Sequence, residues 1–296
     1  MFGIFLVFLA ACSYGGAAIV IKLAYRAGLH PATLLVLQNL VSLALLWPLL
    51  LVRGLPKPGR RQLIRMTWQG LLGNFGLSIC YFWAARRIDV SLLSIILFTY
   101  PGLVLLYQIV LERHRVAAAE LATLVLALCG AILAVNPFQS LPAALDATGV
   151  LLAVGSAATY AFLNVYGQKL SRDLSPLLIT PVTTTVSTMA MMAALPARYW
   201  AAPALSLNQW LLVTALALLS TVLPLNLMYL GLRRIGAYHA SVVSVAELPC
   251  ILILAYFLLH ERLTPVQTAG GVLILLSVVL MRPANGSTGA IPDPNG

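Results

Sequence analysis

The sequence predicts an all-α integral membrane protein with ten transmembrane helices arranged as two inverted five-helix repeats. Three observations support this fold class: the apolar composition, a series of long apolar runs, and motifs that recur at a nearly constant spacing. Of the 296 residues, 61% are hydrophobic and 9% are charged, whereas soluble domains carry about 25% charged residues. With a mean hydropathy of +0.95, the chain lacks the polar residues that would cover a soluble globule of this size.

Ten apolar runs are long enough to cross a bilayer as helices, which takes about 20 residues. They lack the period-2 alternation of barrel strands. The expected spans are residues 2–24, 31–52, 67–85, 90–111, 117–135, 148–168, 176–195, 208–232, 238–259 and 264–281. Between the fifth and sixth spans we expect a linker at residues 136–147, and the Pro-, Gly- and Asn-containing residues 283–296 are expected to form a disordered tail.

The basic residues indicate the orientation in the membrane. The net charge is +10, but the Lys and Arg residues lie in short clusters between the apolar runs, which is typical of a topology signal and does not indicate nucleic-acid binding. The loops on the side of the two termini carry most of them, so both termini are expected in the cytoplasm. The four cysteines lie inside apolar runs without CxxC spacing, so we expect no metal, no cofactor and no disulfide framework.

The two halves of the chain share five motifs at a spacing near 147 residues. They are Ser13-Tyr14 and Thr159-Tyr160, Lys22-Leu23 and Lys169-Leu170, Arg86-Arg87-Ile88 and Arg233-Arg234-Ile235, Pro101 and Pro249, and Glu112-Arg113 and Glu261-Arg262. Since each repeat holds an odd number of spans, the second copy must enter the membrane from the opposite face. We therefore expect inverted repeats at residues 1–135 and 148–282. Two inverted copies that exchange conformations open a central site to each side in turn, which predicts a transporter.

Both repeats end in a motif that carries a family resemblance. The second copy contains Ala246-Glu247-Leu248-Pro249, then Leu259-His260-Glu261-Arg262-Leu263-Thr264 and Gly270-Gly271, and the first contains Tyr100-Pro101, Glu112-Arg113 and Gly130. Over residues 1–282 the chain resembles the EamA-type, ten-helix bacterial members of the drug/metabolite transporter superfamily. The resemblance implies a multi-pass protein of the inner membrane. It also implies a central cavity lined by the first, third, fourth, sixth, eighth and ninth helices.

Glu247 is the main candidate for a substrate-binding residue because it is the only carboxylate near the middle of any span. A charge at the bilayer centre costs about 2.5–3.5 kcal/mol on insertion scales, so such residues usually face a cavity or a partner. Ser244 lies on the same side of the helix. Pro249 cannot donate a hydrogen bond to the Val245 carbonyl, which is expected to remain free nearby. Glu247 either binds a substrate ammonium group or a proton, or it is a neutral structural acid.

Polar stripes on other spans supply the remaining candidate substrate-binding residues. Tyr14 and Tyr160 occupy matching positions in the first and sixth spans. Such stripes either line water or bond to a neighbouring helix, so both interpretations stay open. The candidates, with Glu247 and Ser244, are Tyr14, Asn74, Tyr81, Tyr100, Tyr160 and Asn164.

Two symmetry-related pairs of charges are candidates for gates. Lys22 and Glu261 lie at the outer ends of their spans, and Lys169 and Glu112 lie at the inner ends. Two ion pairs that form alternately would close the two sides in turn. The alternative is that all four are ordinary interfacial charges, with the lysines extending to lipid headgroups.

We therefore expect a secondary transporter that exports a small polar or amphipathic metabolite, such as an amino acid, by alternating access. The expected partners are this solute and membrane lipid, with protons as a candidate coupling ion, in a monomer or a homodimer. A ten-helix channel or facilitator is the alternative. An intramembrane enzyme is disfavoured, because the sequence has no HExxH motif, no GxSxG motif and no pair of mid-membrane aspartates.

Overall fold

In a computed structural model of the chain, the described residues are 1–54, 58–113, 116–136, 146–200 and 205–281. Within these ranges the regular structure is helical, with no strand. The expected tail at residues 283–296 and all but the ends of the expected linker lie outside the described residues. The elements are α1 (Phe2–Arg26), α2 (Pro31–Arg53), α3 (Arg60–Trp68), η1 (Gln69–Phe75), α4 (Gly76–Ala84), α5 (Val90–Leu97), α6 (Tyr100–Leu111), α7 (Ala118–Val135), α8 (Ala147–Asp173), α9 (Pro176–Ala194), η3 (Ala197–Tyr199), α10 (Leu207–Ala217), η4 (Leu218–Val222), α11 (Leu223–Ser244), α12 (Glu247–Leu259) and α13 (Pro265–Leu280).

Seven helical segments among the described residues are long and apolar enough to cross a membrane, and α12 and α13 are apolar but shorter. The seven segments are Phe2–Arg26, Pro31–Arg53, Val90–Leu111, Ala118–Val135, Ala147–Asp173, Pro176–Ala194 and Leu207–Ser244. Large apolar side chains remain exposed on their outer faces, such as Leu51, Val110 and Phe257. Because a surface of this kind is stable only against lipid, the chain is a multi-pass membrane protein.

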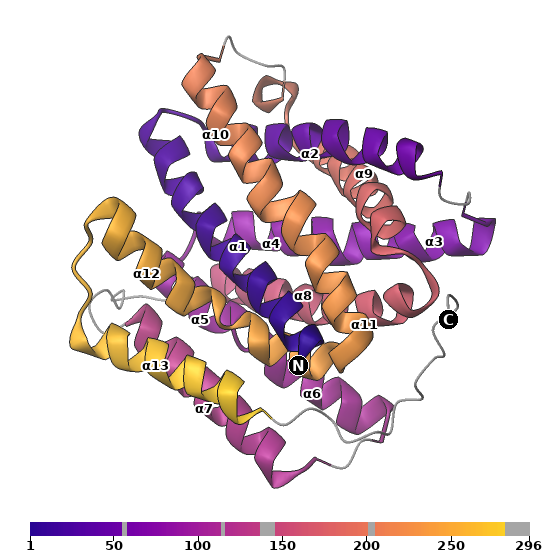
Figure 1. The fold of residues 1–296 in the computed structure, drawn as a ribbon. Helices are drawn as coiled ribbons and strands as arrows, with labels where there is room; N and C mark the ends of the chain where they lie inside the picture. Colours follow the sequence, from indigo (N-terminus) through magenta and orange to yellow (C-terminus); the bar gives the residue numbers. More distant parts are fainter. Residues whose placement is uncertain (55–57, 114–115, 137–145, 201–204, 282–296) are drawn as a thin grey trace.

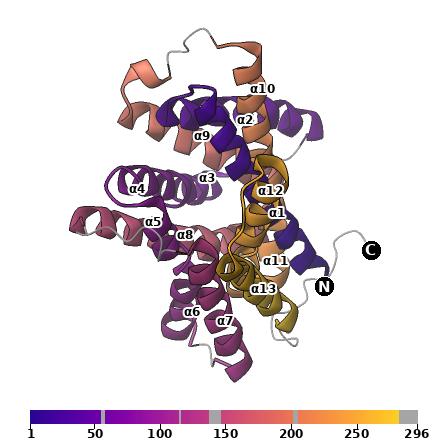
Figure 2. The same ribbon diagram turned by 90° about the vertical axis from the view of Figure 1, so that its left-hand side faces the viewer.

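The helices form a bundle with two distinct edges. The helices α7 and α13 lie together at one edge, α2, α9 and α10 lie at the opposite edge, and α1, α8 and α12 lie between them (Figures 1 and 2). At the α7–α13 contact the backbones are very close: a Cβ atom on Gly270 would lie 2.3 Å from the Ala134 nitrogen and 2.7 Å from the Gly130 carbonyl oxygen. Glycine at both positions is therefore what allows this pair of helices to pack.

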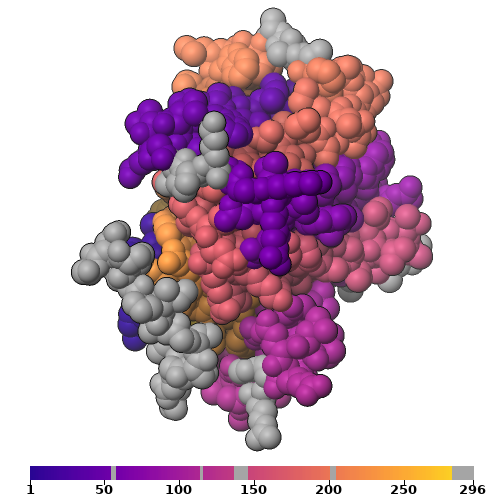
Figure 3. Space-filling view, turned by 90° about the vertical axis from the view of Figure 1, so that its right-hand side faces the viewer, coloured from indigo at the N-terminus to yellow at the C-terminus, as the bar shows by residue number. Residues whose placement is uncertain are grey.

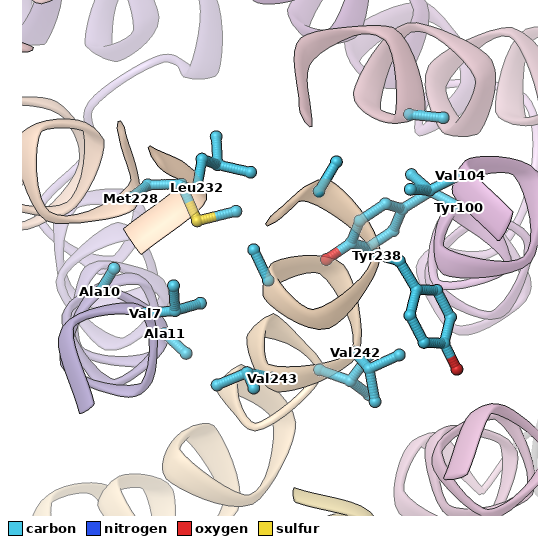
Figure 4. Close-up of a cluster of buried hydrophobic side chains, with 14 of the residues drawn as sticks. Val7, Ala10, Ala11, Tyr100, Val104, Met228, Leu232, Tyr238, Val242 and Val243 are labelled. Atoms are coloured by element: carbon cyan, nitrogen blue, oxygen red, sulfur yellow. The ribbon is translucent and has the colours of Figure 1, made fainter. Parts of the chain in front are cut away.

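The core lies where α1, α6 and α11 meet. Val7, Ala10 and Ala11 of α1 point towards α11, where Met228 and Leu232 lie, and all five side chains are buried (Figure 4). On the other side of α11, Tyr100 of α6 points towards the same helix. The small side chains of α1 allow its close approach to α11, which brings the first part of the chain against the last third.

The expected loop between the eighth and ninth spans is a sharp bend inside α11. Gly236 has φ 81° and ψ 165°, a conformation outside the helical region that glycine adopts without steric cost. The Ala237 N–H that follows donates to Oε1 of Gln168, at 2.9 Å. The side chain of α8 thus satisfies a backbone group at the point where the helical conformation of α11 is interrupted.

Two features of the packing occur once in each half of the chain. A Cβ atom on Gly3 would lie 2.6 Å from Cγ2 of Ile235 and 2.9 Å from Cβ of Arg234. A Cβ atom on Gly149 would lie at the same two distances from Cγ2 of Ile88 and Cβ of Arg87. The wide, π-type turns η1 and η4 likewise fall in the third and eighth apolar runs, at residues 69–75 and 218–222.

Candidate functional site

Two helices are interrupted just before a proline. Helix α5 ends at Leu97 and α6 begins at Tyr100, one residue before Pro101; α11 ends at Ser244 and α12 begins at Glu247, two residues before Pro249. Proline has no N–H to donate, so a regular helix cannot continue through either position without losing a hydrogen bond. The chain turns for two residues instead, and these turns lie in the interior of the bundle.

The backbone group released by the second break differs from the one expected from the sequence. The Val245 carbonyl is not free, because the Leu248 N–H donates to it at 3.0 Å in a tight turn. The Val245 N–H donates to Val242 and not to Ser241, so the Ser241 carbonyl lacks a helical partner. Tyr100 fills this position: its hydroxyl donates to the Ser241 carbonyl oxygen at 2.9 Å. The two breaks are thereby joined by a hydrogen bond between α6 and α11.

Glu247 is the first residue of α12 and is partly exposed. Its carboxylate makes no ion pair or side-chain hydrogen bond within the described ranges. It interacts electrostatically with four tyrosine hydroxyls, those of Tyr14, Tyr81, Tyr100 and Tyr160. The tyrosines come from α1, α4, α6 and α8, so four helices place an aromatic ring near a single acid. Five of the eight candidate substrate-binding residues are therefore brought together.

The tyrosine rings are held in a fixed arrangement. The rings of Tyr100 and Tyr160 stack with their centroids 4.0 Å apart and an interplanar angle of 24°. Tyr100 is fully buried, whereas Tyr14, Tyr81 and Tyr160 keep part of their surface exposed. Ser244 interacts with Tyr100 but is buried, and its hydroxyl donates to the Ala240 carbonyl at 2.8 Å. Ser244 therefore lies buried beside Tyr100 and is not exposed.

Asn74 and Asn164 belong to a second polar group next to the tyrosines. The Asn164 amide donates to the Tyr160 carbonyl of its own helix, at 2.9 Å, and the Asn74 amide donates to the Thr183 hydroxyl at 3.5 Å. In both residues the amide oxygen is buried and has no hydrogen-bond partner within the described ranges. A buried acceptor without a donor costs free energy, and such a group requires an explanation, such as water or a ligand.

Gln69 and Tyr229 complete this second group and were not among the predicted residues. The Gln69 amide donates to the Leu163 carbonyl at 3.0 Å and to the Tyr229 hydroxyl at 3.3 Å, and the Gln69 oxygen is also buried without a partner. Tyr229 interacts in turn with Tyr14, which connects this group to Glu247. Gln69 lies two residues inside the expected third span, close to where that helix was expected to begin. The helix in fact begins earlier, at Arg60.

The wide turn η1 brings Gln69 and Asn74 towards one face of the helix. In an α-helix, residues five apart point about 140° apart, because each residue turns the chain by about 100°. The π-type turn has more residues per turn, which rotates residues five apart towards one face. Gly73 between them adds no side chain. Wide turns of this kind occur frequently at functional sites.

Thr99 is a further residue that the sequence did not single out. It lies in the first helix break at the position that the Pro101–Pro249 spacing aligns with Glu247, and it is exposed. Its hydroxyl donates to the Ile96 carbonyl at 2.7 Å. The repeat spacing is the signal that points to it, although threonine and glutamate differ in chemistry.

Of the two candidate gates, one ion pair is formed. Lys22 Nζ lies 3.1 Å from both carboxylate oxygens of Glu261, and both side chains are about half exposed. The pair is thus at the protein surface, where its contribution to stability is small.

The pair between Lys169 and Glu112 is not formed in the conformation described. Lys169 instead donates to the Tyr107 hydroxyl and lies 5.0 Å from the centre of that ring. At the same end of the molecule, Arg65 forms an ion pair with Asp173 at 2.6 Å and donates a hydrogen bond to the Lys169 carbonyl. Figure 3 shows this end, where the start of α3 lies against the pink segment that includes α8 and α9.

The fold and the site together define a membrane transporter: a multi-pass helical bundle with interrupted helices and a group of polar side chains around one acid in its interior. Residues 1–136 and 147–282 each match the EamA-like transporter family. The chain belongs to this family, and it contains the family's domain twice.

Individual relatives agree with this classification. The chain is similar to the uncharacterized transporter YcbK of Bacillus subtilis (strain 168), with 25% identity over 275 residues, which cover 90% of this chain and 88% of the relative. It is also 25% identical over 207 residues to an uncharacterized transporter of Archaeoglobus fulgidus, covering 70% and 72% of the two chains. A crystal structure with 17% sequence identity has the same fold, with a TM-score of 0.77 over 94% of this chain and 95% of the other.

Proposed function

We propose that the protein is a secondary transporter of the bacterial inner membrane that exports a small amine-bearing solute, such as an amino acid, by alternating access. In this proposal the chain crosses the membrane ten times, with both termini in the cytoplasm. Residues 1–135 and 148–282 are inverted repeats, with residues 136–147 as linker and 283–296 as tail. The solute site lies between the repeats.

The doubled packing contacts support the inverted repeats. Gly3, in the first repeat, packs against Arg234 and Ile235 of the second, and Gly149, in the second, packs against Arg87 and Ile88 of the first. A half-turn axis relating two copies exchanges their contacts in this reciprocal way. The wide turns η1 and η4 also occur once in each half of the chain, and so do the two helix breaks before proline.

The observation that carries the proposal is the convergence of Tyr14, Tyr81, Tyr100 and Tyr160 on Glu247. An unpaired carboxylate inside a membrane protein attracts a cation, and the faces of tyrosine rings attract one as well. An ammonium group fits both, and the apolar part of an amphipathic solute fits the rings. The same carboxylate is the candidate site for a coupling proton, which would compete with the amine.

The state of the two gates supports a conformation closed on the outer side. Lys22 and Glu261 are paired at 3.1 Å, while Lys169 contacts Tyr107 and Glu112 has no ion-pair partner in the described part of the chain. In the proposal the inner pair forms, and the outer pair separates, when the two repeats exchange conformations. A structure in which both pairs are closed at once would oppose this assignment of the gates.

A binding screen on the purified protein tests the solute class. Amino acids, simple amines and carboxylic acids are compared by the shift they cause in the unfolding temperature, because a ligand that binds only the folded state raises it. We expect amines and amino acids to raise it in the wild type, and carboxylic acids without an amine to have no effect. Stabilisation by carboxylic acids alone would contradict the amine assignment.

The variant Glu247→Gln separates binding from folding in this screen. It keeps the size of the side chain and removes the charge, so we expect the unfolding temperature without ligand to stay the same or rise, since a charge inside the membrane region is removed. We expect the affinity for the amine to fall by roughly tenfold or more, the effect of losing about 1.4 kcal/mol of a charge interaction. Unchanged affinity would show that Glu247 is a structural acid.

A channel or facilitator is the alternative function, and the pairing of Lys22 with Glu261 speaks against it. An open channel needs one path to both sides, whereas an ion pair that closes one end favours a carrier with alternating gates. The distinction between them is kinetic.

A further inference from the structure

Two cysteines from opposite ends of the chain meet beside Glu247. Cys12 lies in α1 and Cys250 lies in the first turn of α12, three residues after Glu247. Their Sγ atoms are 2.9 Å apart, and both side chains are partly exposed. The other two cysteines, Cys80 and Cys129, are not in contact with either of them or with each other.

The backbones around this thiol pair are held close together. A Cβ atom on Gly15 would lie 2.9 Å from Cβ of Cys250, 3.2 Å from the Ile251 nitrogen and 3.3 Å from the Glu247 carbonyl oxygen. The two sulfur atoms thus face each other across a contact in which α1 and α12 are almost touching. Bringing them to the disulfide length of about 2.05 Å takes a shift of about 0.9 Å, which is within the range of a small side-chain rotation.

We propose that Cys12 and Cys250 are an oxidisable pair, and that a hydroperoxide converts them to a disulfide that fixes α1 to α12 beside the carboxylate of Glu247. The inference depends on the thiol geometry and not on the identity of the solute. A hydroperoxide, including a lipid hydroperoxide that reaches the pair from the bilayer, is the class of oxidant.

The chemistry takes place in two steps. One thiol attacks the outer oxygen of the hydroperoxide ROOH and its proton passes to the leaving oxygen; the O–O bond breaks, ROH leaves and a sulfenic acid forms. The second thiol attacks the sulfenic sulfur, the S–O bond breaks and water leaves. The sum is two thiols and ROOH giving one disulfide, ROH and H₂O, with both sulfurs oxidised and the peroxide reduced. Reduction by an external thiol reverses the disulfide.

The disulfide acts on a contact that already joins the two halves of the chain. Lys22 of α1 also pairs at 3.1 Å with Glu261, which lies two residues after the end of α12. A covalent bond between the helices holds this contact closed irrespective of the ion pair. Oxidation therefore restricts the motion of α1 against α12, and reduction restores it.

The test treats the full chain in detergent micelles with cumene hydroperoxide, blocks the remaining thiols with an alkylating reagent and maps the products by mass spectrometry without reduction. We expect a peptide pair joined through Cys12 and Cys250, lighter by two hydrogens than the separate peptides, while Cys80 and Cys129 are alkylated. Dithiothreitol should remove the link. Alkylated Cys12 and Cys250, or sulfinic acids without the link, would overturn the proposal.

Matched variants control for misfolding and for chance pairing. The double variant Cys80→Ser/Cys129→Ser should form the link to the same extent as the wild type, and Cys12→Ser should abolish it. A link in the wild type that involves Cys80 or Cys129 to a similar extent would show unspecific oxidation and contradict the assignment.

Hydrogen–deuterium exchange measures the effect on the helices without a solute. We expect exchange in residues 10–16 and 247–254 to slow at least threefold in the oxidised protein and to recover after reduction. Equal exchange in the two forms would show that the disulfide does not restrict α1 and α12, even if the disulfide itself is found. Since no transport is measured, failure of the proposed transport function would leave these results unaffected.

Discussion

At the residue scale, the site consists of one acid, Glu247, and four tyrosines from four helices. Glu247 was predictable because an acid in an apolar run is rare and costly. Tyr14 and Tyr160 followed from the repeat spacing. Gln69 and Tyr229 were not predictable, because their roles depend on the contact of η1 with α8 and α11, and no local pattern encodes that contact. The hydrogen bonding of the carbonyls at the second helix break was also not predictable, because the partner, Tyr100, comes from a distant part of the sequence.

The unpartnered oxygen of Gln69 leads to a prediction about binding. The variant Gln69→Leu removes the buried amide oxygen that has no partner, which is favourable for stability. It also removes the hydrogen bonds to Leu163 and Tyr229, so the two effects offset each other. We expect the unfolding free energy to change by less than about 1 kcal/mol and the affinity for the amine found in the screen to fall. The measurement is chemical denaturation together with ligand titration of both proteins.

The matched control for this prediction is Tyr229→Phe, which keeps the ring and removes the hydroxyl that accepts from Gln69. It should destabilise the protein by about 0.5–1.5 kcal/mol. If Gln69→Leu binds the amine as well as the wild type does, the orphan oxygen faces a buried water and has no part in binding.

At the element scale, helix positions were predictable and helix interruptions were only partly so. The apolar runs gave the positions of the helices because in lipid the backbone must satisfy its own hydrogen bonds. Pro101 and Pro249 were expected inside continuous spans, with one missing hydrogen bond predicted at Pro249, so the two-residue turns were not predicted. The wide turns η1 and η4 had no counterpart in the sequence pattern, because one extra residue per turn hardly alters hydropathy. The bend at Gly236 was expected as a loop, since arginines and a glycine adjoin there.

The contact of α7 with α13 gives a prediction about packing. Gly270→Ala places a methyl group 2.3 Å from the Ala134 nitrogen and 2.7 Å from a carbonyl oxygen, so the helices must move apart. We expect a loss of about 1–3 kcal/mol of unfolding free energy, the usual cost of overpacking.

Gly102→Ala is the control for this change. It lies in α6, and a Cβ atom there would have no neighbour within 4 Å. Alanine favours the helix over glycine, so this variant should be as stable as the wild type or more stable. Equal unfolding temperatures for the two variants would show that the α7–α13 contact is looser than described.

At the scale of the whole molecule, the two halves of the chain share their sequence motifs but differ in individual residues and contacts. The acid of the second helix break, Glu247, aligns with Thr99 in the first, and only one of the two charge pairs is formed. A carrier built from two repeats needs equivalent halves to exchange its conformations. It needs differences between the halves to hold one conformation at a time. The sequence indicated the equivalence through its repeated motifs, but the conformation present is a property of the fold.

The paired contacts of Gly3 and Gly149 test the equivalence. Gly3→Ala and Gly149→Ala each place a methyl group 2.6 Å from an isoleucine Cγ2 atom and 2.9 Å from an arginine Cβ atom. If the two contacts are related by symmetry, the variants should lower the unfolding temperature to a similar extent, and the double variant should lower it by nearly the sum. A large effect of one variant and none of the other would argue against equivalent repeats.

Counterflow in proteoliposomes tests the central claim most directly. The labelled amine identified in the binding screen is added outside vesicles that contain either buffer or a high concentration of the same unlabelled amine. A carrier that reorients with its solute predicts a several-fold faster initial uptake into the loaded vesicles, and no uptake with Glu247→Gln or without protein. Equal rates into loaded and empty vesicles would contradict alternating access and identify the protein as a channel.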